Sequence, residues 1–175
     1  KALDIGCGWR RYGKNALRLD LDPKCQPDIL ADIQGATGLP DASFDTILAL
    51  DVLEHLPYPH RAIAEMERIL KPEGVLYITV PFCFPRHGKE YYRFSDLALQ
   101  DMLSGFDTEI IPVKKSKFWN LVWNYYQQDT IVEGYFVKAR KKIPQEENHL
   151  SGRCHGFRRF RGLLLPYNIL TWPKM

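Results

Sequence analysis

Four short apolar runs fill the first third of the chain and predict buried β-strands. They are separated by turn-forming residues and cover residues 2–5, 16–20, 29–32 and 44–51. Runs of this length between Gly, Pro and Asp residues are typical of strands. A Gly-Cys-Gly turn follows the first run, and the other three end in Asp20, Asp32 and Asp51. The pattern predicts an open α/β sheet that binds a ligand at these strand ends.

The pattern changes to helical spacing after Pro59. Apolar residues recur on one side of residues 62–70, which predicts a helix packed on the sheet. The Lys-Pro-Glu-Gly segment at residues 71–74 should end this helix. A β-rich run at residues 75–81 then predicts the fifth strand.

The remaining elements are more widely spaced. Ser95 is expected to cap a second helix that ends before Gly105. The sixth and seventh strands are expected at residues 108–113 and 131–139. Between them, an aromatic insert at about residues 116–130 predicts a helix. Two interpretations of this insert stay open, core packing and the lining of an acceptor pocket.

The chain changes character at residue 144. We expect a folded domain over residues 1–143, followed by a polar linker and a basic, aromatic tail over residues 144–175. Such a tail is suited to an anionic membrane surface, an acidic partner or RNA. A terminal segment laid back on its own domain is the commoner case, so peripheral membrane contact is not favoured.

The amino-acid composition places few limits on the class of protein. A hydrophobic content of 45% is enough for one core in 175 residues, and a net charge of +3 does not call for a nucleic-acid partner. The four cysteines form no Cys-x-x-Cys pair, which favours reduced thiols and a cytoplasmic protein. No signal peptide and no apolar run long enough to cross a bilayer is visible. The oligomeric state does not follow from these features.

Four sequence blocks together carry a family resemblance. They are Leu-Asp-Ile-Gly-Cys-Gly at residues 3–8, Leu-Pro-Asp-Ala-Ser-Phe-Asp at 39–45, Asp-Val-Leu-Glu-His-Leu at 51–56 and Ile-Leu-Lys-Pro-Glu-Gly at 69–74. With these blocks the chain resembles the class I S-adenosylmethionine-dependent methyltransferases over roughly residues 1–140. The resemblance implies a doubly wound, Rossmann-like α/β fold. Its sheet would have about seven mostly parallel strands, the last antiparallel, in a three-layer sandwich.

The resemblance also implies a cofactor site for S-adenosylmethionine. In the family, the glycine turn faces the methionine part, the acid after strand two holds the ribose and an acid after strand three meets the adenine. The residues that match this site are Asp4, Gly6, Cys7, Gly8, Asp20, Leu21, Asp32, Ile33 and Asp51. Because the first residue is Lys1 and not Met, we expect a missing upstream segment, which in the family is commonly a helix over the cofactor.

The first crossover departs from the family pattern. Only eleven residues separate Gly8 from Asp20, whereas glycine-fingerprint units usually place about twenty there. The first crossover helix is therefore expected to be very short or absent. We expect a shallower pocket, more open on this side.

Two histidines are candidates for a general base. An oxygen acceptor must lose its proton, and histidine suits this task near neutral pH. His55 follows the fourth strand and His87 follows the fifth. The Glu-His pair at residues 54–55 occurs across the resembled family with different substrates, so a role in local architecture is the alternative for His55.

The loop from His87 to Phe94 is assigned to the acceptor side of the pocket. Tyr92 and Arg93 are the candidate substrate residues, through stacking and a charge-assisted hydrogen bond. The alternative is a clamp, in which Arg93 pairs with an acid of its own domain and Phe94 anchors the next helix. Cys83 and His87 alone do not make a zinc site, so we expect no metal.

Two functional hypotheses follow. The first is an enzyme that transfers a methyl group from S-adenosylmethionine to an O or N atom of a small-molecule acceptor. The second is a catalytically inactive methyltransferase-like module that binds partners through its aromatic insert and basic tail. The acids at the strand ends favour the enzyme. A nicotinamide-dependent dehydrogenase is disfavoured, because Arg11 stands where the dinucleotide fingerprint has its third glycine.

Overall fold

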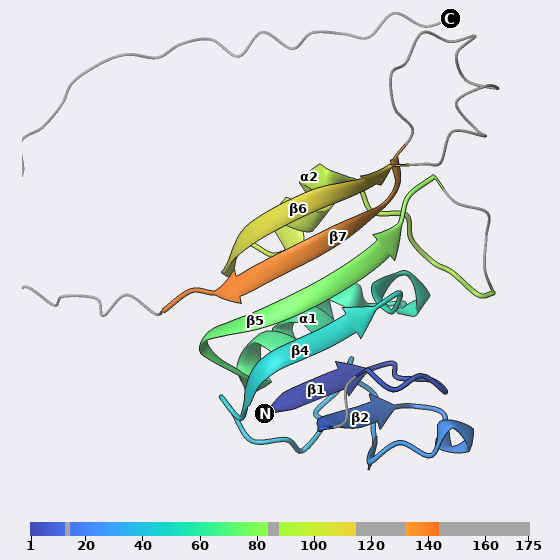
Figure 1. The fold of residues 1–175 in the computed structure, drawn as a ribbon, viewed down its shortest axis with the longest axis vertical. Coiled ribbons are helices and arrows are strands. Elements are labelled where there is room, and N and C mark those ends of the chain that lie inside the picture. Colours follow the sequence, from blue (N-terminus) through green and yellow to red (C-terminus); the bar gives the residue numbers. More distant parts are fainter. Residues whose placement is uncertain (13–14, 84–87, 115–131, 144–175) are drawn as a thin grey trace, which may run out of the picture. The chain divides into compact units, whose positions relative to one another are not determined.

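The protein was analysed as a computed structural model that describes residues 1–12, 15–83, 88–114 and 132–143. The predictions for His87, the aromatic insert and the tail from residue 144 lie outside these ranges. The described residues form one seven-stranded sheet with the order β3-β2-β1-β4-β5-β7-β6 (Figure 1). This is the predicted Rossmann-like α/β arrangement.

Parallel pairing joins the first five strands, and the last two run antiparallel to their neighbours. The strands are β1 (Ala2–Ile5), β2 (Ala16–Asp20), β3 (Ile29–Leu30), β4 (Phe44–Leu50), β5 (Leu70–Pro81), β6 (Phe106–Lys114) and β7 (Val132–Lys141). Each predicted strand is confirmed in type, and β7 inserts between β5 and β6 as the antiparallel strand. The carboxyl ends of β1, β4 and β5 consequently meet at one edge of the sheet.

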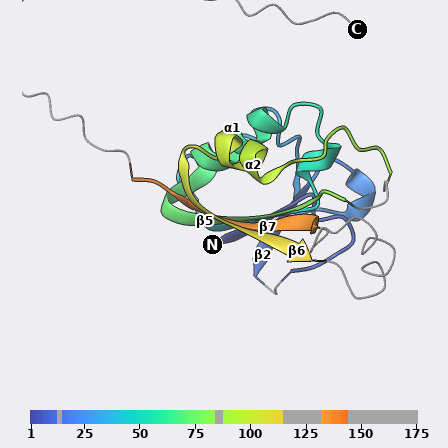
Figure 2. The same cartoon turned by 90° about the horizontal axis from the view of Figure 1, so that it is seen from above.

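Both α-helices lie on one face of the sheet (Figure 2). Helix α1 covers Pro59–Ile69 and α2 covers Asp96–Met102, while short 3₁₀ helices form at η1 (Pro23–Cys25) and η2 (Leu53–His55). Ser95 caps α2 as predicted, because its side chain accepts a hydrogen bond from the Ala98 N–H. The described residues thus supply the sheet and one helical layer of the predicted sandwich. None of the helices in these ranges is long and apolar enough to span a membrane.

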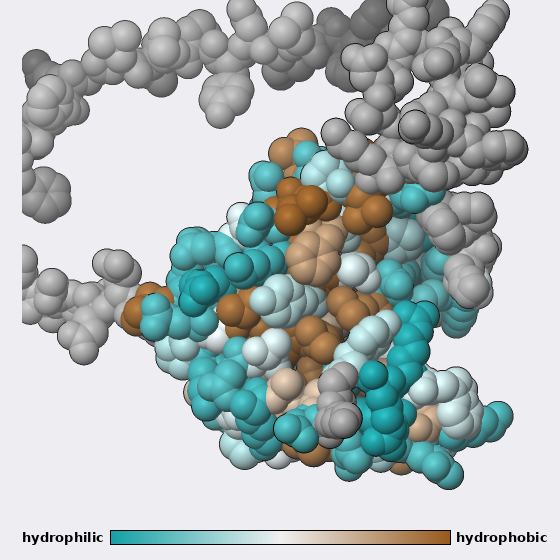
Figure 3. Space-filling model, viewed as in Figure 1, coloured by the Kyte–Doolittle hydropathy of each residue, from teal (hydrophilic) through white to brown (hydrophobic). Residues whose placement is uncertain are grey.

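The core lies between the sheet and these helices. Alternate strand residues such as Ile47, Ile78 and Val137 point to the helices and are fully buried. Their neighbours Leu48 and Phe136 point to the opposite face and stay half-buried. Figure 3 shows hydrophobic residues gathered over the middle of that opposite face.

Strand β5 begins earlier than predicted. The sequence pattern places its start at Val75, but Leu70 already pairs with Phe44 directly after α1. The register shifts between this pair and the next, which accommodates residues 71–74 and the left-handed backbone of Glu73 (φ 60°). Proline and glycine in this segment indicate a turn, whereas the long-range pair that extends the strand depends on tertiary contacts.

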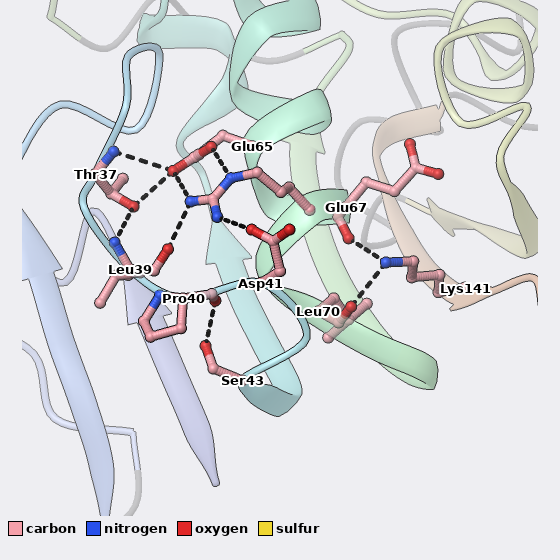
Figure 4. A network of polar contacts seen from close by, with 10 residues as sticks. Thr37, Leu39, Pro40, Asp41, Ser43, Glu65, Glu67, Leu70 and Lys141 are labelled. Atoms are coloured by element: carbon pink, nitrogen blue, oxygen red, sulfur yellow. Dashed lines mark hydrogen bonds and ion pairs between the residues drawn. The ribbon is translucent and has the colours of Figure 1, made fainter.

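The loop between β3 and β4 is tied to α1 by an ion-pair network (Figure 4). The Glu65 carboxylate accepts hydrogen bonds from the Thr37 hydroxyl at 2.6 Å and from Arg68 at 2.7 and 2.8 Å. Arg68 also pairs with Asp41 and donates to the Leu39 carbonyl. This network fixes the chain that leads into β4.

Candidate active site

The glycine turn after β1 has the backbone geometry that its residues predict. Gly6 and Gly8 have φ angles of 62° and 50°, which side-chain-bearing residues rarely adopt. A Cβ on Gly6 would lie 2.7 Å from Val52, so Gly6 is required for packing. A Cβ on Gly8 would meet no atom within 4 Å. Gly8 therefore faces open space that a ligand can fill.

Asp20, at the end of β2, holds this turn in place. Its Oδ2 accepts a hydrogen bond from the Gly8 N–H at 2.8 Å, and its Oδ1 accepts one from the Asp22 N–H at 2.9 Å. The carboxylate thus orients the backbone of the turn from the neighbouring strand. Oδ2 also has the Cys7 thiol at 3.9 Å, whereas Oδ1 keeps a further lone pair for a ligand hydroxyl.

Arg18 holds the glycine turn through hydrogen bonds to main-chain carbonyls, and this role was not predicted from the sequence. Its guanidinium is buried and donates to the carbonyls of Gly8 at 2.7 Å, Cys25 at 2.9 Å and Gln26 at 3.0 Å. In the described part of the β1–β2 connection there is no helix, as predicted. Arg18 instead links the glycine turn to η1, so hydrogen bonds replace helix packing at this position.

A cavity of about 560 Å³ opens beside the glycine turn. The turn, the end of β4, η2, the end of β5 and the start of β7 line it. Six of the predicted site residues belong to its wall, namely Asp4, Gly6, Cys7, Gly8, Asp51 and His55. The fold therefore brings these residues together at the carboxyl edge of the sheet.

The other predicted cofactor residues lie outside this cavity. Asp32 is exposed, and its carboxylate accepts a hydrogen bond from the Gln34 N–H at 2.9 Å. Leu21 is exposed, whereas Ile33 packs into the core. With Asp20, these residues follow β2 and β3 on the side where the first crossover is shortened.

Asp51 is held in a strained conformation at the end of β4. Its φ angle of 56° lies in the left-handed region, which is uncommon for an aspartate. Thr79 of β5 fixes it there: the Thr79 hydroxyl donates to the Asp51 carboxylate at 2.8 Å and accepts from the Asp51 N–H at 2.9 Å. Thr79 also lines the cavity, and it was missed because it lies inside a strand pattern.

His55 has the geometry of a proton acceptor. Its Nδ1 lies 2.8 Å from the Lys89 carbonyl oxygen, which only accepts, so Nδ1 carries the proton. In the neutral ring this leaves a lone pair on Nε2. Nε2 lies 3.8 Å from Oε1 of Glu54.

Two buried carboxyl groups in the cavity wall have raised pKa values. Burial raises the pKa of Glu54 to about 7, and its Oε2 has no hydrogen-bond partner among the described residues. Burial also raises the pKa of Asp4 to about 6, although the facing Arg18 opposes this shift. Glu54 was not among the predicted site residues.

Tyr92 and Arg93 do not line the main cavity. They border a second, smaller one with Glu90, which belongs to both walls. The Tyr92 hydroxyl donates to the Pro57 carbonyl at 2.9 Å, and Arg93 pairs with Glu90 at 2.5 Å. Phe94 is buried. These contacts are those of the clamp, while the acceptor role of Tyr92 and Arg93 stays a prediction.

The first half of the chain is similar to a known protein family. Residues 3–78 match the family described as Methyltransferase domain, and this region includes β1 to β4, α1 and most of β5. This region of the chain is similar to methyltransferase domains. The match spans the glycine turn, Asp20, Asp51 and the Glu54-His55 pair.

Solved structures share the fold of this chain. One is an S-adenosylmethionine-dependent methyltransferase from Mesorhizobium loti (TM-score 0.60, 17% identity, covering 81% of this chain and 90% of that one). Another, from Archaeoglobus fulgidus, has a TM-score of 0.60 and 17% identity and covers 80% of this chain and 85% of its own. The third is the 1,6-didemethyltoxoflavin-N1-methyltransferase of Burkholderia thailandensis with bound S-adenosylhomocysteine (TM-score 0.58, 19% identity, 81% and 71% coverage).

Proposed function

We propose that this protein transfers a methyl group from S-adenosylmethionine to an O or N atom of a small-molecule acceptor. The observation that carries the proposal is the open space beside Gly8, within a cavity whose wall includes the matched methyltransferase motifs. We assign this activity to residues 1–143, with residues 144–175 as linker and tail.

The residues present fit the cofactor. The space at Gly8 accepts a ligand against the main chain, and Asp4 has a buried carboxylate oxygen without a hydrogen-bond partner in the described residues. Asp4, Gly6, Cys7, Gly8 and Asp51 would face the methionine part. The adenosine part would extend over the ends of β2 and β3, against Asp20, Leu21, Asp32 and Ile33.

The bound cofactor would supply a sulfonium, which is already a strong methyl donor. The protein's task is then to orient the acceptor in line with the methyl group, exclude water and take up a proton where the acceptor carries one. His55 Nε2 is the proposed proton acceptor for a hydroxyl, since its lone pair is free of the Lys89 contact. His87 and the Tyr92-Arg93 pair stay predictions for the acceptor side.

An inactive binding module is the second candidate. The observation that favours it is the separation of the predicted adenosine residues from the main cavity, which leaves that side of the site open. Binding of S-adenosylhomocysteine without turnover of S-adenosylmethionine on any acceptor would support this candidate over the enzyme.

Calorimetric titration with S-adenosylhomocysteine tests the proposal. Gly8→Val should reduce the affinity at least tenfold, because the side chain would occupy the space that the ligand needs. Gly38→Val is the matched control: Gly38 also has a positive φ angle of 74° with no atom near its Cβ, but it lies outside the cavity. Undiminished affinity of Gly8→Val, or an equal loss in both variants, would refute the proposed site.

A further inference from the structure

The cavity wall is strongly acidic away from the glycine turn. Asp4 and Asp51 lie at the turn end, and three more carboxyl groups follow beyond them, from Glu54, Glu90 and Glu133. The basic groups in the described wall are Arg10 and His55. A low-dielectric cavity lined by one sign of charge concentrates ligands of the opposite sign.

Glu54 is the most informative of these groups. Its side chain is 2% exposed, and its Oε2 has no hydrogen-bond partner in the described part of the chain. Buried carboxylates are normally paired or fully hydrogen-bonded, because their desolvation is costly. Glu54 lines the cavity and has one buried oxygen without a partner among the described residues.

The surroundings of Glu54 make an unpaired carboxylate still less favourable. Asp51 and Glu90 lie close enough to repel its negative charge, and His55 is the basic group nearest to it, at 3.8 Å. Glu90 itself is paired with Arg93 at 2.5 Å, so this arginine is already engaged with a neighbouring acid. A cation bound next to Glu54 would relieve both the desolvation and the repulsion.

We propose that the methyl acceptor is an amine, and that Glu54 is the residue that holds its ammonium group. This inference rests on the proposed function and names the substrate class of that site. Asp4 and Asp51 lie nearer the glycine turn and would serve the cationic end of the cofactor, which leaves Glu54 for a second cation. The geometry thus selects nitrogen over oxygen as the acceptor atom.

The amine reaction balances with the groups present. The bound ammonium gives one proton to the Glu54 carboxylate and becomes a neutral amine. Its nitrogen lone pair forms a bond to the methyl carbon, and the carbon–sulfur bond breaks with its electron pair left on sulfur. The products are a methylated ammonium ion and a neutral thioether, so the positive charge passes from sulfur to nitrogen.

Three matched probes test the charge preference: 2-phenylethylamine, 2-phenylethanol and phenylacetate. They are titrated by calorimetry into the full chain saturated with S-adenosylhomocysteine. The amine should bind at least tenfold more tightly than the alcohol, and the acid more weakly still. In Glu54→Gln the preference for the amine should fall about tenfold, while the alcohol is unaffected. Glu109→Gln, an exposed charge change on β6, is the control and should leave all three unchanged.

The outcomes separate this inference from the proposed function. If the wild type fails to bind S-adenosylhomocysteine, the proposed function falls and the inference falls with it. If the wild type binds S-adenosylhomocysteine but does not prefer the amine probe, the inference alone is overturned. The same holds if it binds S-adenosylhomocysteine and none of the three probes. If Glu54→Gln loses S-adenosylhomocysteine together with the amine, Glu54 serves the cofactor or the fold, and the assignment is wrong.

Discussion

Buried charged residues shape this site more than its motifs indicate. Arg18 lies within an ordinary strand pattern, yet it contributes three hydrogen bonds to main-chain carbonyls beneath the glycine turn. Its charged side chain inside the run Ala-Leu-Arg-Leu was the available signal. A strand pattern alone does not say which charged residue will be enclosed, because burial depends on the loops that pack over it.

The pKa of Glu54 leads to a prediction about stability and pH. Its ordinary value is 4.5 and burial raises it to about 7, with Asp51 and Glu90 adding repulsion and His55 opposing them. The folded state therefore binds a proton that the unfolded state has released, so stability should decrease as pH rises from about 4.5 through 7. Thermal unfolding of the free protein between pH 6 and 8 measures this decrease.

Glu54→Gln supplies the comparison for that measurement. The variant removes the titrating group, so its melting temperature should vary less across pH 6–8 and exceed that of the wild type at pH 8. Asp4 also has a raised pKa, of about 6, but it is present in both proteins. The difference in melting temperature between the variant and the wild type therefore reports on Glu54. Identical pH profiles for the two proteins would show that Glu54 does not titrate in this range.

At the scale of elements, side-chain networks replace missing helices. The loop between β3 and β4 is anchored to α1 through Glu65 and Arg68, and the glycine turn is linked to η1 through Arg18. Lys141 of β7 donates to the carbonyls of Glu67 and Leu70 at the end of α1, where the helix offers these carbonyls no N–H donor of its own (Figure 4). Short connections can therefore be rigid without a helix of their own.

The network around Glu65 gives the second stability prediction. Hydrogen bonds from Arg68 lower the pKa of Glu65 from 4.5 to about 2, against a smaller opposing effect of burial. The resulting stability is fully present above pH 4.5 and is lost as pH falls towards 2. Glu65→Gln should lower the free energy of unfolding by about 1 to 3 kcal/mol at pH 7, and by less at pH 3.

Glu67→Gln is the matched control for this change. Glu67 lies on the same helix, and its contact with Lys141 uses the backbone carbonyl, which the substitution leaves intact. Urea unfolding at pH 7 and pH 3 compares the variants. An equal effect of both substitutions, or an effect of Glu65→Gln that does not shrink at pH 3, would contradict the network's role.

The element order was the part of the fold that the sequence predicted best. Apolar runs and the Ser95 cap placed the strands and α2 within a few residues, because local periodicity and capping decide these features. The start of β5 was misplaced, since Leu70 joins the strand through a long-range pair with Phe44. Local turn residues do not reveal such a pair.

For the same reason, the sequence predicted some residues of the site and missed others. Residues in contiguous motifs, such as Gly8, Asp51 and His55, meet in the cavity. Glu54 and Thr79 were not singled out, because their importance lies in burial and in a contact between β4 and β5. Motifs indicate residues that a family shares. Burial of a side chain and polar atoms without a hydrogen-bond partner can be seen only in the folded structure.

On the scale of the whole molecule, we propose that the cavity at the carboxyl edge of the sheet is the methyl-transfer site. The sheet order, the glycine turn and the acidic wall all converge on this edge. The described helices lie on one face of the sheet (Figure 2). The cavity is lined from the ends of β4 and β5 and the start of β7.

A crystal structure of the protein soaked with S-adenosylhomocysteine tests this claim most directly. We expect the homocysteine part to lie against Gly6 and Gly8, with the ribose hydroxyls within hydrogen-bond distance of Asp20. The sulfur should point towards His55 and Glu54. Density for the ligand elsewhere on the protein, or a sulfur directed away from the acidic wall, would contradict the proposed methyl-transfer site.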